Sequence, residues 1–284
     1  MSYKVSIIGL GLIGGSIALD LKRTGFATEI TGVDKSSQHE QEALKLGIID
    51  KISPFSTAIQ QSDIIILATP VDASLELLPS ILKFINPNSV VTDVGSTKSS
   101  LIKKVKNYPN RQLYVASHPM SGTENSGPSA AIQNLFKDKV SIICNAEESS
   151  YKSIEIISDM YKALGSKIVF MDSESHDEHV GYVSHLSHAI SYALAVAVLE
   201  KEKNDSAIFN LASGGFASTV RLAKSSVDMW LPIFIQNSKY LLPIINTYLD
   251  KLTEFKSYLE NGDTKKLSEF ITEANHIKGK LEKK

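Results

Sequence analysis

The first 171 residues alternate short uninterrupted apolar runs with segments of helical periodicity. Such runs predict strands buried on both faces, and the segments between them predict the helices that cover those faces. The predicted strands are residues 5–8, 30–33, 64–68, 90–93, 113–116, 140–144 and 168–170. The predicted helices are residues 12–23, 38–46, 73–84, 97–106 and 151–164. This order predicts an α/β fold with a doubly wound, mostly parallel sheet.

The pattern changes after Met171, and we predict no strand in residues 172–284. Helices are predicted at residues 174–203, 228–259 and 267–277, and Gly214-Gly215 interrupts the segment between the first two. Pro243 lies inside the second helix and predicts a kink or a break, because proline has no backbone N–H for the helical ladder. We therefore expect an α/β domain over 1–171 and an all-α domain over 172–284.

Composition narrows the class of protein. Hydrophobic residues make up 43% and charged residues 21% of 284 residues, as in an ordinary folded protein. The formal net charge of −1 gives no sign of a nucleic-acid surface or a polybasic membrane patch. The single cysteine, Cys144, predicts a reducing, cytoplasmic location. Glycines in the uncharged stretch 5–19 argue against a signal peptide, and we expect no later apolar run to be long enough to span a membrane.

A glycine fingerprint stands directly after the first predicted strand. Its letters are Gly9-Leu10-Gly11-Leu12-Ile13-Gly14, which fit G-x-G-x-x-G and open the first helix. In a dinucleotide site, Gly9 makes the tight turn, Gly11 admits a pyrophosphate and Gly14 lets helix pack on strand. Leu12 and Ile13 begin the helix whose N-terminus faces the phosphates. The context therefore predicts a Rossmann dinucleotide site, with an FAD site, a nucleotide-sugar site or a structural turn as alternatives.

Asp34 ends the second predicted strand and favours NAD over NADP. A carboxylate at this place accepts hydrogen bonds from the ribose hydroxyls and repels a 2′-phosphate. The neighbouring Lys35 weakens that preference. We also expect cofactor contacts from Thr69, Pro70 and Val71, which follow another strand, since open α/β sheets bind ligands at the carboxyl ends of their strands.

Two further strand ends carry candidate chemistry. Gly95 permits close approach of a cofactor, and Ser96 offers a hydroxyl as a ligand, as a helix N-cap, or as both. His118 follows the strand predicted to end at Ala116, where a neutral imidazole can take the proton of an alcohol that is being oxidised. The loop residues Ser121, Gly122 and Thr123 come next and are candidate substrate contacts.

The predicted helix 174–203 carries His176, His179, His185 and His188. On a helical wheel His185 and His188 share a face, whereas His176 lies opposite, so the four do not form a metal site. We expect His185 and His188 to face an anionic substrate or an interdomain cleft, and His176 to be a helix-start and packing residue. Arg221 suits either a bidentate clamp on a substrate carboxylate or an interface salt bridge.

Taken in order, the motifs resemble those of the prephenate/arogenate dehydrogenase family of tyrosine biosynthesis. They are GLGLIGGS, Asp34, TPV, DVGSTK, HPMSGTE, HD, SHLSH, GGF, TVRLA, MW and Asn237. The resemblance implies NAD-dependent oxidative decarboxylation of a cyclohexadienyl substrate. In it, His118 takes the proton of the ring hydroxyl, Ser96 positions that hydroxyl, and His185 and Arg221 hold substrate carboxylates. The helical domain would pair with its copy to form a homodimer.

Three departures from the family pattern concern the substrate side. Ser187 replaces a usual proline, Ala217-Ser218 replaces Arg-Asp, and Pro232 replaces an acidic residue. The residues leave prephenate and arogenate undecided. A β-hydroxyacid-type dehydrogenase is a second hypothesis, although a lysine would then be expected on the long helix where this chain has His185 and His188. A non-catalytic NAD-sensing dimer is a third, and it would need no proton acceptor at His118.

Overall fold

The computed structural model describes residues 2–203 and 205–282, and in that part of the chain eight strands form one sheet. The strands are β1 (Tyr3–Ile8), β2 (Ala27–Val33), β3 (Lys51–Ile52), β4 (Ile64–Leu67), β5 (Val90–Asp93), β6 (Tyr114–Pro119), β7 (Val140–Cys144) and β8 (Lys167–Met171). Their order is β3-β2-β1-β4-β5-β6-β7-β8. Strands β1 to β6 run parallel, β7 is antiparallel to β6, and β8 is parallel to β7. The predicted α/β class and mostly parallel sheet are confirmed.

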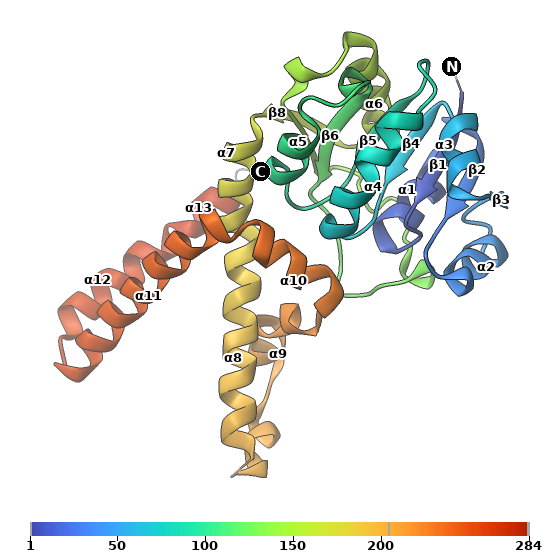
Figure 1. Cartoon of the computed structure of the whole chain (residues 1–284). Helices are drawn as coiled ribbons and strands as arrows, with labels where there is room; N and C mark the ends of the chain where they lie inside the picture. The colour runs from blue at the N-terminus through green and yellow to red at the C-terminus, as the bar shows by residue number, and fades with distance from the viewer. Residues whose placement is uncertain (1, 204, 283–284) are drawn as a thin grey trace.

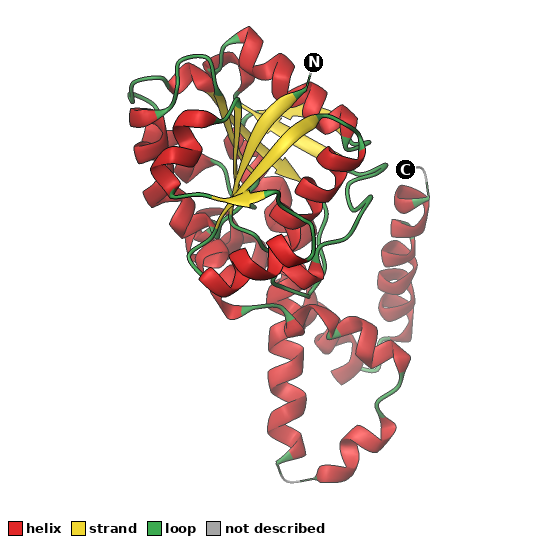
Figure 2. Cartoon of the chain, turned by 90° about the vertical axis from the view of Figure 1, so that its right-hand side faces the viewer, coloured by secondary structure: helices red, strands yellow, loops and turns green. Residues whose placement is uncertain are grey.

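Helices cover both faces of this sheet (Figures 1 and 2). They are α1 (Leu12–Arg23), α2 (Ser37–Lys45), α3 (Phe55–Gln61), α4 (Val71–Phe84), α5 (Ser99–Val105) and α6 (Tyr151–Ala163). Apolar residues of α1 and α6 pack on one face, and those of α3, α4 and α5 pack on the other. Burial of the sheet on both faces explains why its strands read as uninterrupted apolar runs.

The chain order reverses between β1 and β4, which lie side by side although β2 and β3 separate them in sequence. Open α/β sheets bind ligands in the crevice at such a reversal, outside the carboxyl ends of the strands. The turns after β1, β4 and β5 and the end of β6 therefore lie along one edge. These are the places where the sequence predicts functional residues.

Several predicted bounds differ from the structure. The short β3 and α3 were not predicted, since two strand residues and seven helical residues give little periodicity. Strand β6 continues past Ala116 to Pro119, so His118 lies within the strand instead of in the loop after it. The extension has a clear cause, because β7 pairs with β6 there and His118 lies opposite Ile142.

The rest of the described chain is helical. Its elements are α7 (Ser173–Val180), η4 (Gly181–His185), α8 (Leu186–Glu202), α9 (Gly214–Thr219), α10 (Val227–Gln236), α11 (Ser238–Glu260), α12 (Thr264–Asn275) and α13 (Ile277–Leu281), with short 3₁₀ turns at Ser206–Leu211 and Arg221–Lys224. Helices α7 and α8 continue each other through the π-helical turn η4. The interruption expected at Gly214-Gly215 falls directly before this pair, because a 3₁₀ turn ends at Leu211 and α9 begins at Gly214.

The break expected at Pro243 falls six residues earlier, at Asn237 between α10 and α11. Pro243 lies in the second turn of α11, and Pro232 lies inside α10. Asn237 is fully buried and its side chain bonds to α7 and η4. Tertiary hydrogen bonds at this junction, and not the proline, therefore set the place of the break.

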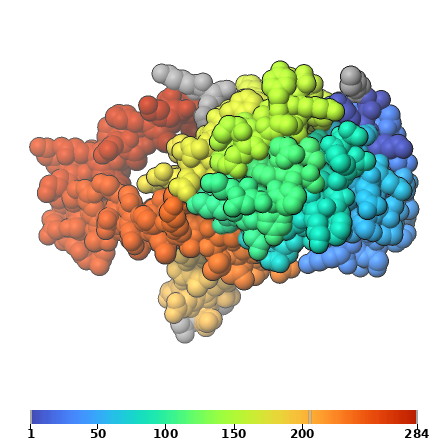
Figure 3. All heavy atoms as spheres, turned by 45° about the horizontal axis from the view of Figure 1, so that its top comes forward, coloured from blue at the N-terminus to red at the C-terminus, as the bar shows by residue number. Residues whose placement is uncertain are grey.

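Many apolar side chains of the helical part stay exposed in the single chain. They include Val183, Val196, Leu231, Ile235, Leu242, Leu249, Leu252 and Leu259. Helices α11 and α12 project away from the α/β part (Figures 1 and 3). By length and composition the continuous helix Ser173–Glu202 could cross a membrane, so the expectation that no later segment reaches that length is wrong. Exposed apolar surface of this extent also marks protein–protein interfaces.

Candidate active site

The glycine turn after β1 has the geometry that a bound pyrophosphate requires. Gly9 adopts φ of +99°, and a Cβ placed on it would lie 2.3 Å from the carbonyl oxygen of Ala68. A Cβ on Gly14 would lie 2.1 Å from the carbonyl oxygen of Gly9. Gly11 differs, because a Cβ there meets no described atom within 4 Å. Gly9 and Gly14 are thus required by the fold, whereas Gly11 leaves open space at the N-terminus of α1, where the helix dipole favours phosphate.

Asp34 lies beside this turn, directly after β2. Its Oδ2 accepts a hydrogen bond from the backbone N–H of Leu10 at 2.8 Å, and its Oδ1 accepts one from Ser36 at 2.9 Å. These bonds hold the carboxylate against the glycine turn, as a ribose-binding residue requires. His39 Nδ1 lies 3.5 Å from Asp34 Oδ1, so a histidine stands beside this carboxylate in addition to Lys35.

Residues from the next two strand ends meet at the same edge. Thr69 Oγ1 lies 2.9 Å from Ser74 Oγ, which ties the turn after β4 to α4. A Cβ on Gly95 would lie 3.0 Å from Val71 Cγ1, so the turns after β4 and β5 touch. Val71 also packs with Trp230 of α10, which brings the helical part to this edge. The fold therefore gathers the glycine turn, Thr69-Pro70-Val71 and Gly95 in one place, as the sequence predicts.

A buried ion pair fixes the turn that follows β5. Lys98 and Asp93 are both fully buried and form this pair. Lys98 Nζ also donates to the carbonyl oxygen of Ser117 at 2.6 Å, and Tyr114 donates its hydroxyl proton to Asp93 Oδ1 at 2.6 Å. Because these bonds join β5 to β6, they hold the turn that carries Ser96 in register with the strand that carries His118.

Ser96 does not cap α5, which corrects one of the two roles that the sequence suggests for it. The helix begins at Ser99, two residues later than predicted, and the backbone N–H groups at its N-terminus are satisfied by Asp177 of α7. Asp177 Oδ1 accepts from the backbone N–H of Lys98 at 2.8 Å, and Oδ2 accepts from that of Ser99 at 2.9 Å. Ser96 is half-buried, and its role toward substrate stays a prediction.

His118 forms a buried chain of hydrogen bonds with two residues of α7. Its Nδ1 lies 2.8 Å from Nε2 of His176, and His176 Nδ1 lies 2.8 Å from Oδ1 of Asp177. His118 is 9% exposed, His176 0% and Asp177 2%. The sequence analysis treated His176 as a packing residue, since helical periodicity cannot show which strand a helix face meets.

The electrostatic surroundings keep His118 neutral. Burial, followed by the nearby His176, Lys98 and His185, holds the pKa of His118 well below its ordinary value of 6.5. The pKa of His176 is also lowered, chiefly by burial. A neutral imidazole at the carboxyl edge of the sheet is the proton acceptor that alcohol oxidation requires.

His185 lies in the π-helical turn and is 1% exposed. Its Nδ1 is 2.7 Å from Nδ2 of Asn237, whose amide also donates to the backbone carbonyl of Asp177 at 2.8 Å. Among the described residues His185 Nε2 has no hydrogen-bond partner although it is buried. An unpaired buried polar atom is costly and calls for a partner, as a substrate carboxylate would be.

His188, expected on the same helix face as His185, stacks on the indole of Trp230 with ring centroids 3.4 Å apart. Burial lowers the pKa of His185 to about 4, and it also lowers that of His188. The Trp230 ring therefore joins α8 to α10 beside the place where His185 lies.

Arg221 is half-exposed, not in the mainly apolar setting that its sequence neighbours suggest. Its Nη1 lies 2.9 Å from Oε2 of Glu124, so in this structure it forms the salt bridge that was the alternative to a substrate clamp. In the loop before Glu124, Ser121 donates to the carbonyl oxygen of Leu135 at 2.8 Å. Thr123 Oγ1 accepts from the backbone N–H of Asn125 at 3.2 Å, and Gly122 is exposed. Substrate contacts by these residues stay predictions.

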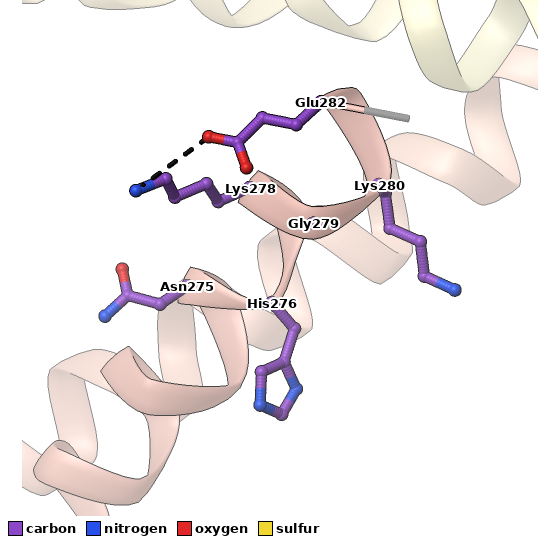
Figure 4. A pocket seen from close by; sticks show the side chains of 6 residues that line it. All are labelled: Asn275, His276, Lys278, Gly279, Lys280 and Glu282. Carbon is purple, nitrogen blue, oxygen red and sulfur yellow. Dashed lines mark ion pairs between the residues drawn. The ribbon is translucent and has the colours of Figure 1, made fainter. Parts of the chain in front are cut away.

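A hollow at the C-terminal helices lies apart from these residues (Figure 4). It is lined by Asn275, His276, Lys278, Gly279, Lys280 and Glu282, none of which belongs to the strand ends or to α7. In the described part of the chain, no three His, Cys, Asp or Glu side chains are grouped as metal ligands.

Comparison with known proteins gives consistent matches. Residues 17–170 match the family model for the prephenate dehydrogenase nucleotide-binding domain, and residues 172–273 match that for the prephenate dehydrogenase dimerisation domain. Prephenate dehydrogenase from Lactococcus lactis is 33% identical over 98% of this chain and 77% of that protein. Cyclohexadienyl dehydrogenase from Zymomonas mobilis is 31% identical over 95% of this chain and 93% of that protein.

Among solved structures, prephenate dehydrogenase from Aquifex aeolicus in complex with hydroxyphenyl propionate and NAD+ matches with a TM-score of 0.91. It is 29% identical, and the match covers 99% of this chain and 98% of that chain. The fold and the site define a dinucleotide-dependent oxidoreductase with a helical dimerisation domain. The chain belongs to the prephenate dehydrogenase family. The predicted family, enzyme class and nucleotide-binding domain are thereby confirmed.

Two glycine substitutions should separate folding from cofactor binding. Gly9→Ala places a methyl group against the backbone of Ala68 at a positive φ, so the free energy of unfolding should fall by about 1–3 kcal/mol or more. Gly11→Ala enters open space at a φ of −82°, so stability should change little while the affinity for NAD falls. Urea unfolding and calorimetric titration with NAD measure the two effects. Equal NAD affinity in Gly11→Ala and wild type would contradict the placement of the pyrophosphate.

Proposed function

We propose that this chain is a homodimeric, NAD-dependent prephenate dehydrogenase that converts prephenate to 4-hydroxyphenylpyruvate in tyrosine biosynthesis. One observation carries the proposal: the buried, neutral imidazole of His118 lies on the same edge of the sheet as the glycine turn. The chain also belongs to the prephenate dehydrogenase family. Residues 1–171 would hold the cofactor, and residues 172–284 would complete the substrate site and form the dimer.

The residues present fit a bound NAD. Gly11 leaves space at the helix N-terminus, and Asp34 is held beside the turn for the ribose. The cofactor-binding set would be Gly9, Gly11, Leu12, Ile13, Gly14, Asp34, Thr69, Pro70, Val71 and Gly95. When bound there, NAD supplies a hydride acceptor to the ring carbon that carries the substrate hydroxyl.

The chain's own residues would manage the proton and the carboxylates. His118 accepts the hydroxyl proton while the C–H electron pair leaves that carbon as hydride. The bond between the ring and its carboxylate then breaks, CO₂ departs, and the electron pair of that bond completes the aromatic ring as a phenolate, which takes a proton back to become the 4-hydroxyphenyl product. Ser96 would position the hydroxyl, and the unpaired Nε2–H of His185 suits a substrate carboxylate. Arg221 would bind a second carboxylate, with Ser121, Gly122 and Thr123 from the neighbouring loop.

Arogenate is a second candidate substrate. The similarity to cyclohexadienyl dehydrogenase from Zymomonas mobilis supports testing it beside prephenate. Prephenate and arogenate differ in a keto or an amino group on the side chain, so one contact could select between them. The buried thiol of Cys144 and the family of enzymes to which the chain belongs support a location in the cytoplasm.

Turnover of prephenate with NAD is the direct test of this function. Purified protein should form NADH with prephenate, and His118→Asn should lower kcat by about 10²–10⁴-fold because it removes the proton acceptor. NAD affinity should stay within about twofold, since the glycine turn is unchanged. Arogenate and NADP are tested in parallel. NAD binding without turnover of either substrate would contradict the proposal and favour a hydroxyacid dehydrogenase or an NAD sensor.

Exposed apolar residues of the helical part should hold the homodimer together. An apolar groove is lined by Ala189, Phe234, Ser238, Leu241, Leu242 and Ile245. Because charges at an apolar interface are costly to desolvate, the double variant Ile235→Glu/Leu242→Glu should sediment as a monomer. Tyr151→Glu changes a still more exposed apolar side chain on α6 of the α/β part and should remain dimeric. A dimer in both variants would contradict this interface.

A further inference from the structure

We propose that His176 and Asp177 form a positioning relay that holds His118 in the tautomer with hydrogen on Nδ1, leaving its Nε2 free to accept the substrate proton. The identity of that proton rests on the proposed function, whereas the tautomer of His118 does not. The proposal gives a positioning role to two residues of α7 that the sequence pattern alone places only at a helix start.

The direction of the relay follows from Asp177. Its carboxylate is an acceptor only when ionised. Burial by itself would raise the pKa of Asp177, but His176 and the two backbone N–H groups donate to the carboxylate and hold that pKa below its ordinary value. His176 must therefore donate through Nδ1, which lies 2.8 Å from Asp177 Oδ1. A neutral His176 then has a lone pair on Nε2.

That lone pair fixes the state of His118. His176 Nε2 lies 2.8 Å from His118 Nδ1, so His118 must donate through Nδ1. The opposite arrangement would aim an unprotonated His176 Nδ1 at the Asp177 carboxylate, where two acceptors would face each other. Among the described residues no hydrogen bond to protein is present at His118 Nε2. The one nitrogen left for substrate is thus the unprotonated one.

The relay is also rigid, because backbone hydrogen bonds hold Asp177, its last residue, in place. Asp177 accepts from the backbone N–H groups of Lys98 and Ser99, directly after the turn that carries Ser96. The backbone carbonyl of Asp177 accepts from Asn237, which lies at the α10–α11 junction. The three buried groups of the relay therefore have little room to reorient, and a residue that sets the tautomer of a catalytic histidine can matter as much as the base itself.

The chain offers a matched set of variants. His176→Leu removes the acceptor for His118 Nδ1–H, whereas the amide of His176→Gln can accept from His118 and donate to Asp177. His179→Leu makes the same change at an exposed position three residues further along α7. We expect His176→Leu to lower kcat by about 10²-fold with little change in NAD affinity, His176→Gln to recover most of that loss, and His179→Leu to match wild type.

Nitrogen NMR of protein labelled with ¹⁵N-histidine tests the relay without turnover. Signals assigned through His118→Asn should show His118 with hydrogen on Nδ1 in wild type, and a mixture of tautomers in His176→Leu. Hydrogen on Nε2 in wild type would overturn the proposal, whatever the variants do. Equal kcat and equal tautomers in His176→Leu and His179→Leu would overturn it too. The expected tautomer in a protein that turns over neither prephenate nor arogenate would support the relay and contradict the proposed function.

Discussion

The carboxylate of Asp177 is the point on which the site depends. It is buried, and it accepts hydrogen bonds from His176 and from the backbone of Lys98 and Ser99. Loss of this group would leave buried donors without a partner, which costs about 1–3 kcal/mol for each. Because Asn237 bonds to the backbone carbonyl of the same residue, the start of α5, helix α7 and the α10–α11 junction meet there.

This meeting point explains how a sheet edge and a helical part make one site. The strand ends supply rigid turns for a dinucleotide, and β6 supplies His118. The helical part supplies His176 against that residue and also His185, whose Nε2 has no hydrogen-bond partner in the described part of the chain. His118 is thus oriented through His176 by Asp177, and His185 is oriented by Asn237. In the proposed function the first acts as a proton acceptor and the second as a hydrogen-bond donor.

Much of the fold and of the cofactor side follows from sequence, because the signals are local. Apolar runs predict the buried strands, and the glycine spacing predicts the turn at Gly9, which the positive φ bears out. The contacts of His176 and Asp177 could not be predicted in this way. Their partners lie 58 to 79 residues away, and periodicity carries no information about which distant element a buried polar side chain meets. The helix break at Asn237 could not be predicted for the same reason.

The pH dependence of kcat/KM for prephenate tests most directly whether buried His118 is the proton acceptor. Burial, followed by the nearby His176, Lys98 and His185, lowers the pKa of His118 well below 6.5, so its neutral form persists as the pH falls through that value. We predict that kcat/KM stays level down through pH 6.5 and declines only at lower pH. A decline centred at or above pH 6.5 that disappears in His118→Asn would contradict this account, because it would show an acceptor with the pKa of an exposed histidine.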